Sequence, residues 1–198
     1  MKNTLTSLFV LLATSLIAIG AVDTGATAPD FTLTDTQGVE HRLSDFKGKL
    51  VVLEWTNHKC PVVKNHYKDG DMQATQKELT EGGVIWLQVV SSAEGKQGHI
   101  TGAEGEAIRK EGGHHSTAML LDASGEVGRQ YGAKTTPHMF VIDGAGTLIY
   151  QGAIDNARSK SMKESGPINY VKAAYSSAKS GQAVEVGATP PYGCGVKY

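Results

Sequence analysis

The chain has 198 residues, of which 40% are hydrophobic and 20% are charged, and its formal net charge is −1. This length suits one domain, and the composition argues against global disorder because it supplies an ordinary apolar core. The small net charge argues against a nucleic acid as the main partner, since no excess of Lys and Arg exists to displace counterions from phosphates.

The first residues predict the compartment. Lys2 precedes an apolar stretch at residues 8–19, and the small residues Gly20 and Ala21 close it. This order is typical of a secretory signal peptide, which we place at residues 1–21. The alternative is an uncleaved anchor helix, because the stretch is close to the ~20 residues that span a bilayer. Both interpretations predict a periplasmic or secreted domain.

The rest of the chain divides into a linker, one domain and a tail. The linker covers residues 22–28, and the domain covers residues 29–181. The tail, residues 182–198, is predicted to be irregular and carries Cys194.

The strands are predicted in three apolar runs and two hairpins. Short, continuously apolar runs are typical of central strands covered on both faces; they are residues 50–53, 84–87 and 118–121. Each hairpin has two alternating stretches around a polar turn that contains Gly. The hairpin strands are residues 31–34 with 39–43, and residues 138–142 with 147–150.

Helices are predicted between these strands. The longest covers residues 61–80, because Pro61 suits the first helical position, and residues 69–71 predict a break within it. Thr101 with Glu104 matches a capping box that opens a short helix. The other two helices are predicted at residues 126–131 and from Pro167 to Gly181.

Cys60 lies where the first central strand has ended and a helix begins. A thiolate there is stabilised by the helix dipole and by unpaired backbone N–H groups. His58, Lys59 and Lys64 add positive charge, and such surroundings lower the pKa of a cysteine and make it a nucleophile. We therefore predict a redox-active cysteine. The alternative is a buried structural cysteine.

Glu54 is an acid inside an otherwise apolar strand. Desolvation would raise the pKa of its carboxyl group, which could then pass a proton to or from the thiol of Cys60. The alternative is that Glu54 points into solvent at the end of the strand.

Four stretches together resemble a known family. They are residues 51–55, residues 60–64, Thr136-Pro137 before a strand, and residues 144–146 in the next turn. The pattern is similar to that of a thioredoxin-fold redoxin. It is closer to the peroxiredoxin-like branch of the alkyl hydroperoxide reductase and thiol-specific antioxidant superfamily. The likeness extends over residues 28–198. It implies an α/β fold with a central mixed β-sheet flanked by helices.

The resemblance also implies roles for particular residues. By position, Cys60 is the first, nucleophilic cysteine of a thioredoxin C-x-x-C motif, and Glu54 is the buried acid of that fold. Pro137 falls on the cis-proline that faces the active site, so the Thr136-Pro137 bond is expected to be cis and to lie beside Cys60. The predicted substrate-facing surface consists of Pro137, Thr136, Trp55 and Pro61.

The sequence departs from the family pattern in two places. Val63 stands where the second cysteine of C-x-x-C belongs. Peroxiredoxins carry a proline seven residues and a threonine three residues before the peroxidatic cysteine, and this chain has Leu53 and Asn57 there. The resemblance therefore favours exchange with thiols and disulfides, and it makes peroxidase activity doubtful.

Cys194 is the only other cysteine in the chain. An extended tail reaches ~3.3 Å or more per residue, and Gly193 and Gly195 give the backbone freedom to approach a cleft. Because Val63 cannot resolve a bond formed on Cys60, we predict that Cys194 does so, within one chain or across a dimer. The alternative is a permanent disulfide that ties down the tail, since cysteine pairs persist outside the cytoplasm.

Two other classes of function remain open. His58, His66 and His138 could converge with Cys60 in a chaperone for copper or another soft metal, although their spacing matches no established signature and no metal site is predicted. His114-His115, in a Gly-flanked loop, is predicted to be solvated. The second rival is a redox-inert thioredoxin-fold binding module.

The sequence favours an extracytoplasmic oxidoreductase that acts on protein or small-molecule thiols, disulfides or peroxides. No organic cofactor is expected, because sulfur itself carries the electrons. No nucleic-acid partner is expected, and no membrane contact beyond the N-terminal segment.

Overall fold

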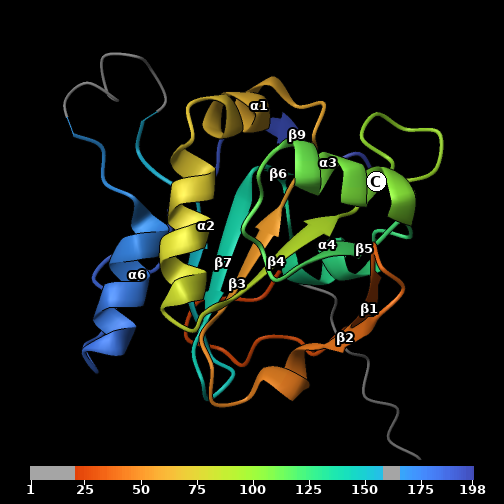
Figure 1. Cartoon of the computed structure of the whole chain (residues 1–198). Helices are drawn as coiled ribbons and strands as arrows, with labels where there is room; N and C mark the ends of the chain where they lie inside the picture. The colour runs from red at the N-terminus through yellow and green to blue at the C-terminus, as the bar shows by residue number, and fades with distance from the viewer. Residues whose placement is uncertain (1–20, 158–165) are drawn as a thin grey trace, which may run out of the picture.

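A computed structural model describes residues 21–157 and 166–198 of the chain. A seven-stranded sheet with the order β2-β1-β5-β4-β3-β7-β8 forms its centre (Figure 1). The strands are β1 (Thr32–Asp35), β2 (Glu40–Arg42), β3 (Val51–Trp55), β4 (Ile85–Val90), β5 (Ala118–Leu121), β7 (His138–Ile142) and β8 (Leu148–Gly152). The predicted signal peptide, residues 1–21, lies outside the described residues except for residue 21.

The sheet is mixed, as the family resemblance implied. Strand β3 pairs in parallel with β4 and antiparallel with β7, and β5 continues the sheet in parallel beside β4. The N-terminal hairpin of β1 and β2 joins the sheet because β1 also pairs with β5. In the centre, Glu54 of β3 lies in register with Gln88 of β4. Polar side chains from two neighbouring strands therefore lie side by side within the sheet.

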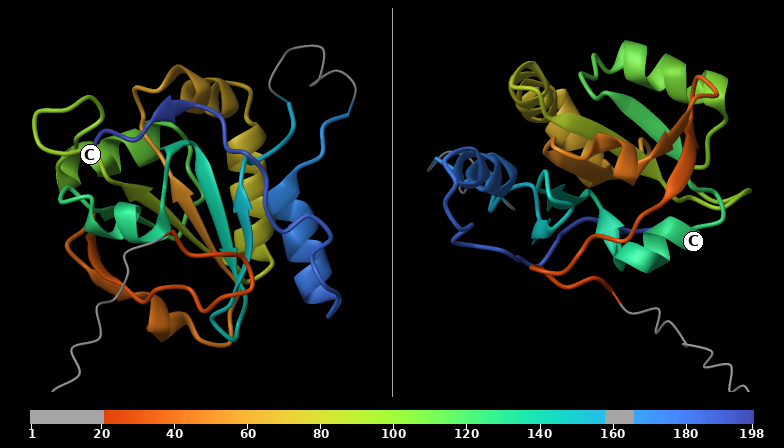
Figure 2. Two further views of the ribbon diagram at one scale, coloured as in Figure 1. Left: turned by 180° about the vertical axis from the view of Figure 1, so that it is seen from behind. Right: turned by 90° about the horizontal axis from the view of Figure 1, so that it is seen from below.

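Helices cover both faces of the sheet, as the view from below shows (Figure 2). On one face, α2 and α6 pack against Val52, Trp86 and Met139, and on the other face α4 packs against Trp55 and Phe140. The helices are α1 (Pro61–Lys68), α2 (Asp71–Glu81), α3 (Gly102–Glu111), α4 (Glu126–Tyr131) and α6 (Tyr170–Lys179), with the 3₁₀ turn η1 (Leu43–Phe46). Among residues 21–157 and 166–198, no helix has the length and apolar character needed to cross a membrane.

Several predicted details are confirmed. The break at residues 69–71 separates α1 from α2, with Gly70 in the left-handed conformation at φ +81°. Pro61 is the first residue of α1. Thr101 and Glu104 form a complete capping box at the start of α3.

Two predictions about the C-terminal part are wrong. The last helix begins at Tyr170 and not at Pro167, because the side chain of Asn169 accepts the N–H of Lys172 and caps the helix there. The tail is not entirely irregular, because Cys194–Gly195 forms the short strand β9. Strand β9 pairs antiparallel with β6, the two residues Thr135–Thr136 that precede Pro137.

Candidate functional site

Cys60 occupies the position just before the first turn of α1. Its backbone is extended, and Pro61 follows as the first helical residue. The chain reaches this position from the buried strand β3 through the turn at residues 56–59. Cys60 itself is 0% exposed, whereas Pro61 is exposed. The sulfur therefore lies at the N-terminal end of a helix but beneath the surface, where the positive end of the helix dipole acts in a poorly solvated environment.

The sulfur of Cys60 contacts two groups from distant parts of the chain. The Sγ atoms of Cys60 and Cys194 are 2.7 Å apart, and the carbonyl oxygen of Thr136 lies 3.2 Å from the Sγ atom of Cys60. Both cysteines are free thiols. The tail thus brings Cys194 to Cys60, and no large movement of the backbone is needed to join them.

Strand pairing at the Thr136-Pro137 loop holds Cys194 in place. Strand β9 runs beside β6 with Thr136 opposite Cys194, and the N–H of Val196 donates to the carbonyl oxygen of Lys134 at 3.1 Å. Figure 2 shows this part of the tail passing beside α1 and the ends of the central strands. A Cβ atom at Gly193, where φ is +147°, would collide with the carbonyl oxygen of Thr136. The close approach of the tail therefore requires glycine at position 193.

The tail is also anchored before it reaches the cysteines. The hydroxyl of Thr189 lies 2.7 Å from the hydroxyl of Tyr150 and accepts the N–H of Ala153 at 3.0 Å. The hydroxyl of Tyr192 donates to a carboxylate oxygen of Asp155. These contacts tie the tail to β8 and to the loop that follows it.

The two thiols differ in acidity. Burial acts to raise the pKa of Cys60, but hydrogen bonds from the Cys194 thiol and from the backbone N–H of Val63 outweigh it, so the pKa lies below the usual 9.0. Burial and the neighbouring Cys60 both raise the pKa of Cys194. The direction for Cys60 agrees with the sequence-based expectation. The leading favourable contributions come from hydrogen bonds and not from the exposed Lys59 and Lys64.

The structure places the residues that were predicted to face the substrate. The Thr136-Pro137 bond is cis, and Thr136 touches the sulfur of Cys60, so this loop lies beside the cysteine as expected. The placement of Trp55 on that surface is wrong. Its side chain is 0% exposed and packs against Tyr131 and Phe140, because the central strand β3 is covered on both faces.

Glu54 is fully buried, so the alternative in which it points into solvent is wrong. Its carboxylate accepts hydrogen bonds from four side chains: Tyr67 at 2.9 Å, Gln76 at 3.0 Å, Trp86 at 2.8 Å and Gln88 at 3.5 Å. Burial raises the pKa of Glu54 above 4.5, while the four donors act to lower it. Among the described residues, neither cysteine is a hydrogen-bond partner of Glu54. A direct proton shuttle from Glu54 to Cys60 therefore has no support in the observed contacts.

Sequence reasoning missed the partners of Glu54 and misjudged His114. The ring of His114 stacks on Tyr67 with 4.2 Å between ring centroids, and its Nδ1 atom lies 3.0 Å from the Oε1 atom of Gln88. Burial lowers the pKa of His114 to about 4. His114 is therefore packed and neutral, and the expectation of a solvated side chain is wrong. Gln88 gave a signal that could have been used, because it interrupts its apolar strand just as Glu54 interrupts the neighbouring one.

The structure gives no support to the metal interpretation. Within residues 21–157 and 166–198, no three His, Cys, Asp or Glu side chains form a group that could hold a metal ion. His66 faces Asp155 and Tyr192, and His138 accepts the backbone N–H of Lys134. These histidines therefore have other partners in the described part of the chain.

Comparisons with known proteins agree with this architecture. A model of the AhpC/TSA family matches residues 24–151. The thiol-disulfide oxidoreductase ResA of Geobacillus thermodenitrificans is 30% identical over 130 residues, which are 65% of this chain and 68% of that protein. The ResA protein of Geobacillus kaustophilus is 58% identical over 40 residues, which are 20% of this chain and 23% of that protein.

Similarity to a solved structure supports the same fold. An uncharacterized conserved protein from Geobacillus kaustophilus superposes with a TM-score of 0.79 at 24% identity, over 89% of this chain and 92% of that chain. At this identity the likeness concerns the fold alone. The mixed sheet, the flanking helices and the cis-proline loop beside a cysteine at a helix start form a thioredoxin-like fold. Together with the family match over residues 24–151, these features show that the chain belongs to the AhpC/TSA family.

Proposed function

We propose that this protein is an extracytoplasmic thiol-disulfide oxidoreductase in which Cys60 is the nucleophile and Cys194 the resolving cysteine. The observation that carries the proposal is the 2.7 Å contact between the two sulfur atoms at the start of α1, beside the cis-proline loop. The similarity to thiol-disulfide oxidoreductases named ResA supports the same reaction class.

The exchange needs only the two thiols and a disulfide substrate. The Cys60 thiolate attacks one sulfur of the substrate disulfide, forms a mixed disulfide and releases the first substrate thiolate, which takes up a proton. Cys194 then loses its proton and attacks the Cys60 sulfur, and the second substrate thiolate leaves. The substrate has gained two electrons, and Cys60 and Cys194 have become a disulfide. The reverse sequence oxidises a substrate dithiol.

The order of attack follows from the acidity of the two cysteines. The pKa of Cys60 is lowered and that of Cys194 is raised, so Cys60 is the first to become a thiolate. Because Cys60 is fully buried beside β9, the segment that carries Cys194 has to move aside before a substrate sulfur reaches Cys60. The same segment returns when Cys194 resolves the mixed disulfide.

Glu54 acts on the helix that presents Cys60, and not on the sulfur directly. It contacts α1 through Tyr67, whose hydroxyl donates to the Glu54 carboxylate at 2.9 Å. Its carboxyl group therefore supports α1 through this hydrogen bond, without contact to either cysteine. The extracytoplasmic location rests on the signal-like pattern of residues 1–21.

Reaction with 5,5′-dithiobis(2-nitrobenzoate) tests the proposal. Attack by Cys60 releases one thionitrobenzoate, and resolution by Cys194 releases the second and leaves a Cys60–Cys194 disulfide. We expect the wild type to release both and to carry no label in mass spectrometry. The Cys194→Ser variant should release one and retain the label on Cys60, and Cys60→Ser should react only slowly.

Two outcomes would contradict the proposal. If the wild type retains labels on both cysteines, Cys194 does not resolve the intermediate. If Cys60→Ser reacts as fast as Cys194→Ser, Cys60 is not the activated thiol and the redox-inert module becomes the better account. Metal analysis of the purified protein tests the chaperone alternative independently.

A further inference from the structure

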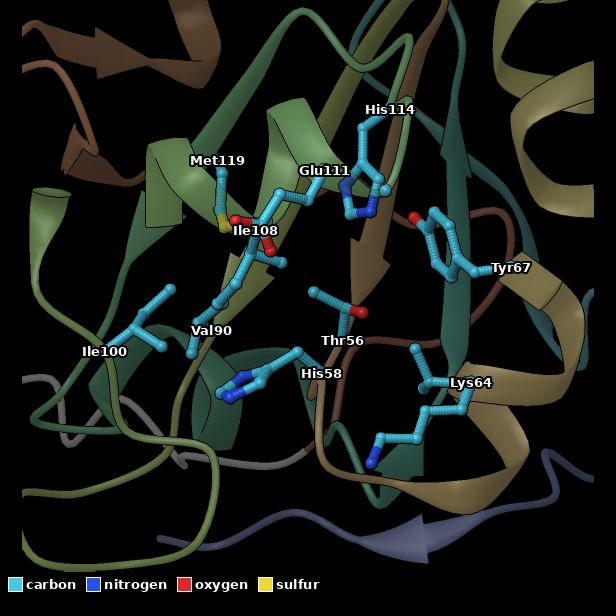
Figure 3. A pocket seen from close by; sticks show the side chains of 12 residues that line it. Thr56, His58, Lys64, Tyr67, Val90, Ile100, Ile108, Glu111, His114 and Met119 are labelled. Carbon is cyan, nitrogen blue, oxygen red and sulfur yellow. The ribbon is translucent and has the colours of Figure 1, made fainter. Parts of the chain in front are cut away.

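A hollow of about 290 Å³ opens on the side of α1 that faces α3 (Figure 3). It is separate from the contact between Cys60 and Cys194. Its lining is mainly apolar, and the apolar side chains that carry the argument are Val63, Val90, Ile100, Ile108 and Met119. Pockets that bind small molecules typically combine such an apolar lining with a few convergent polar groups.

Polar side chains line more than one wall of this pocket, and three of them come from β3, the turn after it and α1. Thr56 directly follows β3, His58 lies in the turn after it, and Lys64 projects from α1 (Figure 3). All three can donate hydrogen bonds, and Lys64 carries a positive charge. Among the described residues, neither the side chain of His58 nor that of Lys64 has a hydrogen-bond or ion-pair partner.

The hydroxyl of Thr56 is a second, independent indication of a ligand. Thr56 is only 5% exposed, and its backbone N–H donates to the carbonyl oxygen of Val89 at 3.0 Å. Its hydroxyl, by contrast, has no hydrogen-bond partner within residues 21–157 and 166–198. Figure 3 shows this hydroxyl directed into the pocket, on the side where Lys64 lies. The hydroxyl atom itself is open to the pocket and is not a buried unpaired group, so it can donate a hydrogen bond to a ligand there.

The other end of the pocket carries a carboxylate in place of hydrogen-bond donors. Glu111 lies there beside Ile108 and Met119, across the pocket from Lys64 (Figure 3). Its carboxylate repels an anion at that end, while Thr56 and Lys64 attract one at the other. The arrangement therefore orients a ligand with its negative head toward α1 and its apolar body over Ile108 and Met119.

We propose that this pocket binds a small organic acid, with its carboxylate held by Thr56 and Lys64 and an aliphatic or aromatic body in the apolar part. The ligand would lie against the same helix that presents Cys60. Its binding does not require thiol exchange, so the proposed function and this proposal can fail separately.

Titration calorimetry with octanoate, octan-1-ol and acetate tests the proposal on the full-length protein. Octanoate should bind saturably, octan-1-ol about tenfold more weakly because it lacks the charge, and acetate not measurably because it lacks the apolar body. Lys64→Met and Thr56→Val should each weaken octanoate by about tenfold and leave octan-1-ol unchanged. Ile108→Trp, which fills the apolar part, should abolish binding of both.

Lys68→Met is the matched control, because Lys68 is exposed on the same helix but does not line the pocket. It should bind octanoate like the wild type. Circular dichroism and release of thionitrobenzoate show whether each variant is folded and whether thiol exchange is intact. The proposal is overturned if octanoate shows no saturable binding, or if Lys64→Met and Thr56→Val bind it unchanged. Equal binding of octan-1-ol and octanoate would overturn the acid class and leave a receptor for uncharged apolar groups.

Discussion

The protein has two polar sites near the end of β3, and they are built in opposite ways. Around Glu54, side chains from β4, α1 and α2 supply hydrogen-bond donors from within the packed body of the domain. The contact between Cys60 and Cys194 depends on a tail segment that pairs with a two-residue strand. The first site is enclosed by packed elements of the fold, whereas the second is held by the pairing of two short strands. Under the proposed function, the site around Glu54 supports the helix, and the site formed by the tail performs the exchange.

The strongest test of this contrast is removal of the buried carboxylate. Glu54→Ala leaves the buried side chains of Tyr67 and Trp86 without their acceptor, so we expect the free energy of unfolding to fall by about 4 kcal/mol. Urea denaturation measures the change.

Two control variants complete that experiment. Glu81→Ala, at an exposed position with a 4.0 Å ion pair to Lys77, and Cys194→Ser in the tail should both stay within about 0.5 kcal/mol of the wild type. A loss in Cys194→Ser as large as in Glu54→Ala would show that the tail is part of the rigid structure, and the contrast would be lost.

Acid should lower the stability of the folded protein through His138. His138 directly follows Pro137, and burial lowers the pKa of its imidazole from 6.5 to about 4. Between pH 6.5 and about 4, the unfolded chain therefore binds a proton at His138 that the folded chain does not. The resulting stability is complete above pH 6.5 and is lost as the pH falls to about 4, by up to about 3 kcal/mol.

His138→Asn isolates this effect, because asparagine retains an acceptor for the N–H of Lys134 but does not titrate. We expect urea midpoints of the wild type to decline between pH 6.5 and 4 more steeply than those of the variant. His115→Asn, at an exposed position, is the control and should follow the wild type. Parallel pH profiles of the wild type and His138→Asn would show that His138 is not the responsible group.

A methyl group at position 193 should separate the two sulfur atoms. Gly193→Ala places a Cβ atom against the carbonyl oxygen of Thr136 at a positive φ, so we expect disulfide formation between Cys60 and Cys194 to slow by about tenfold. Release of the second thionitrobenzoate measures this step. Gly181, just before the tail, also has a positive φ but has open space around it, so Gly181→Ala should leave the rate nearly unchanged.

The smallest expected effect comes from the anchor of the tail. Thr189→Val removes the hydroxyl that contacts Tyr150 and Ala153, at a cost of about 1 kcal/mol in local stability. Resolution by Cys194 should then slow only a few-fold, because β9 remains paired with β6. Thr34→Val, at an exposed strand position, is the control. An effect larger than that of Gly193→Ala would place the main restraint at Thr189.

The sequence predicted those parts of the fold and the site that depend on local pattern. Apolar runs revealed the central strands, Pro61 marked the start of α1, and Cys60 with Glu54 stood out as polar or reactive residues in apolar surroundings. These signals work because each is contained within a few neighbouring residues.

The remaining features depend on partners that are distant in sequence. Gln76 on a helix looks like any solvent-facing residue until the fold turns it toward Glu54. Strand β6 has two residues, which is too short for any alternation to show, and its partner lies 58 positions away. Pro167 is a good helix starter in isolation, yet the side chain of Asn169 supplies the cap that sets the start of α6.

The anchored tail has a consequence for how the reaction responds to its surroundings. Because Thr189 is fixed and Cys194 follows after a short stretch, the resolving thiol behaves as a tethered reagent whose effective concentration near Cys60 is of order millimolar or more. The second step is then unimolecular. Its rate stays constant when the protein is diluted, and free thiols compete with it only when their concentration approaches that effective value.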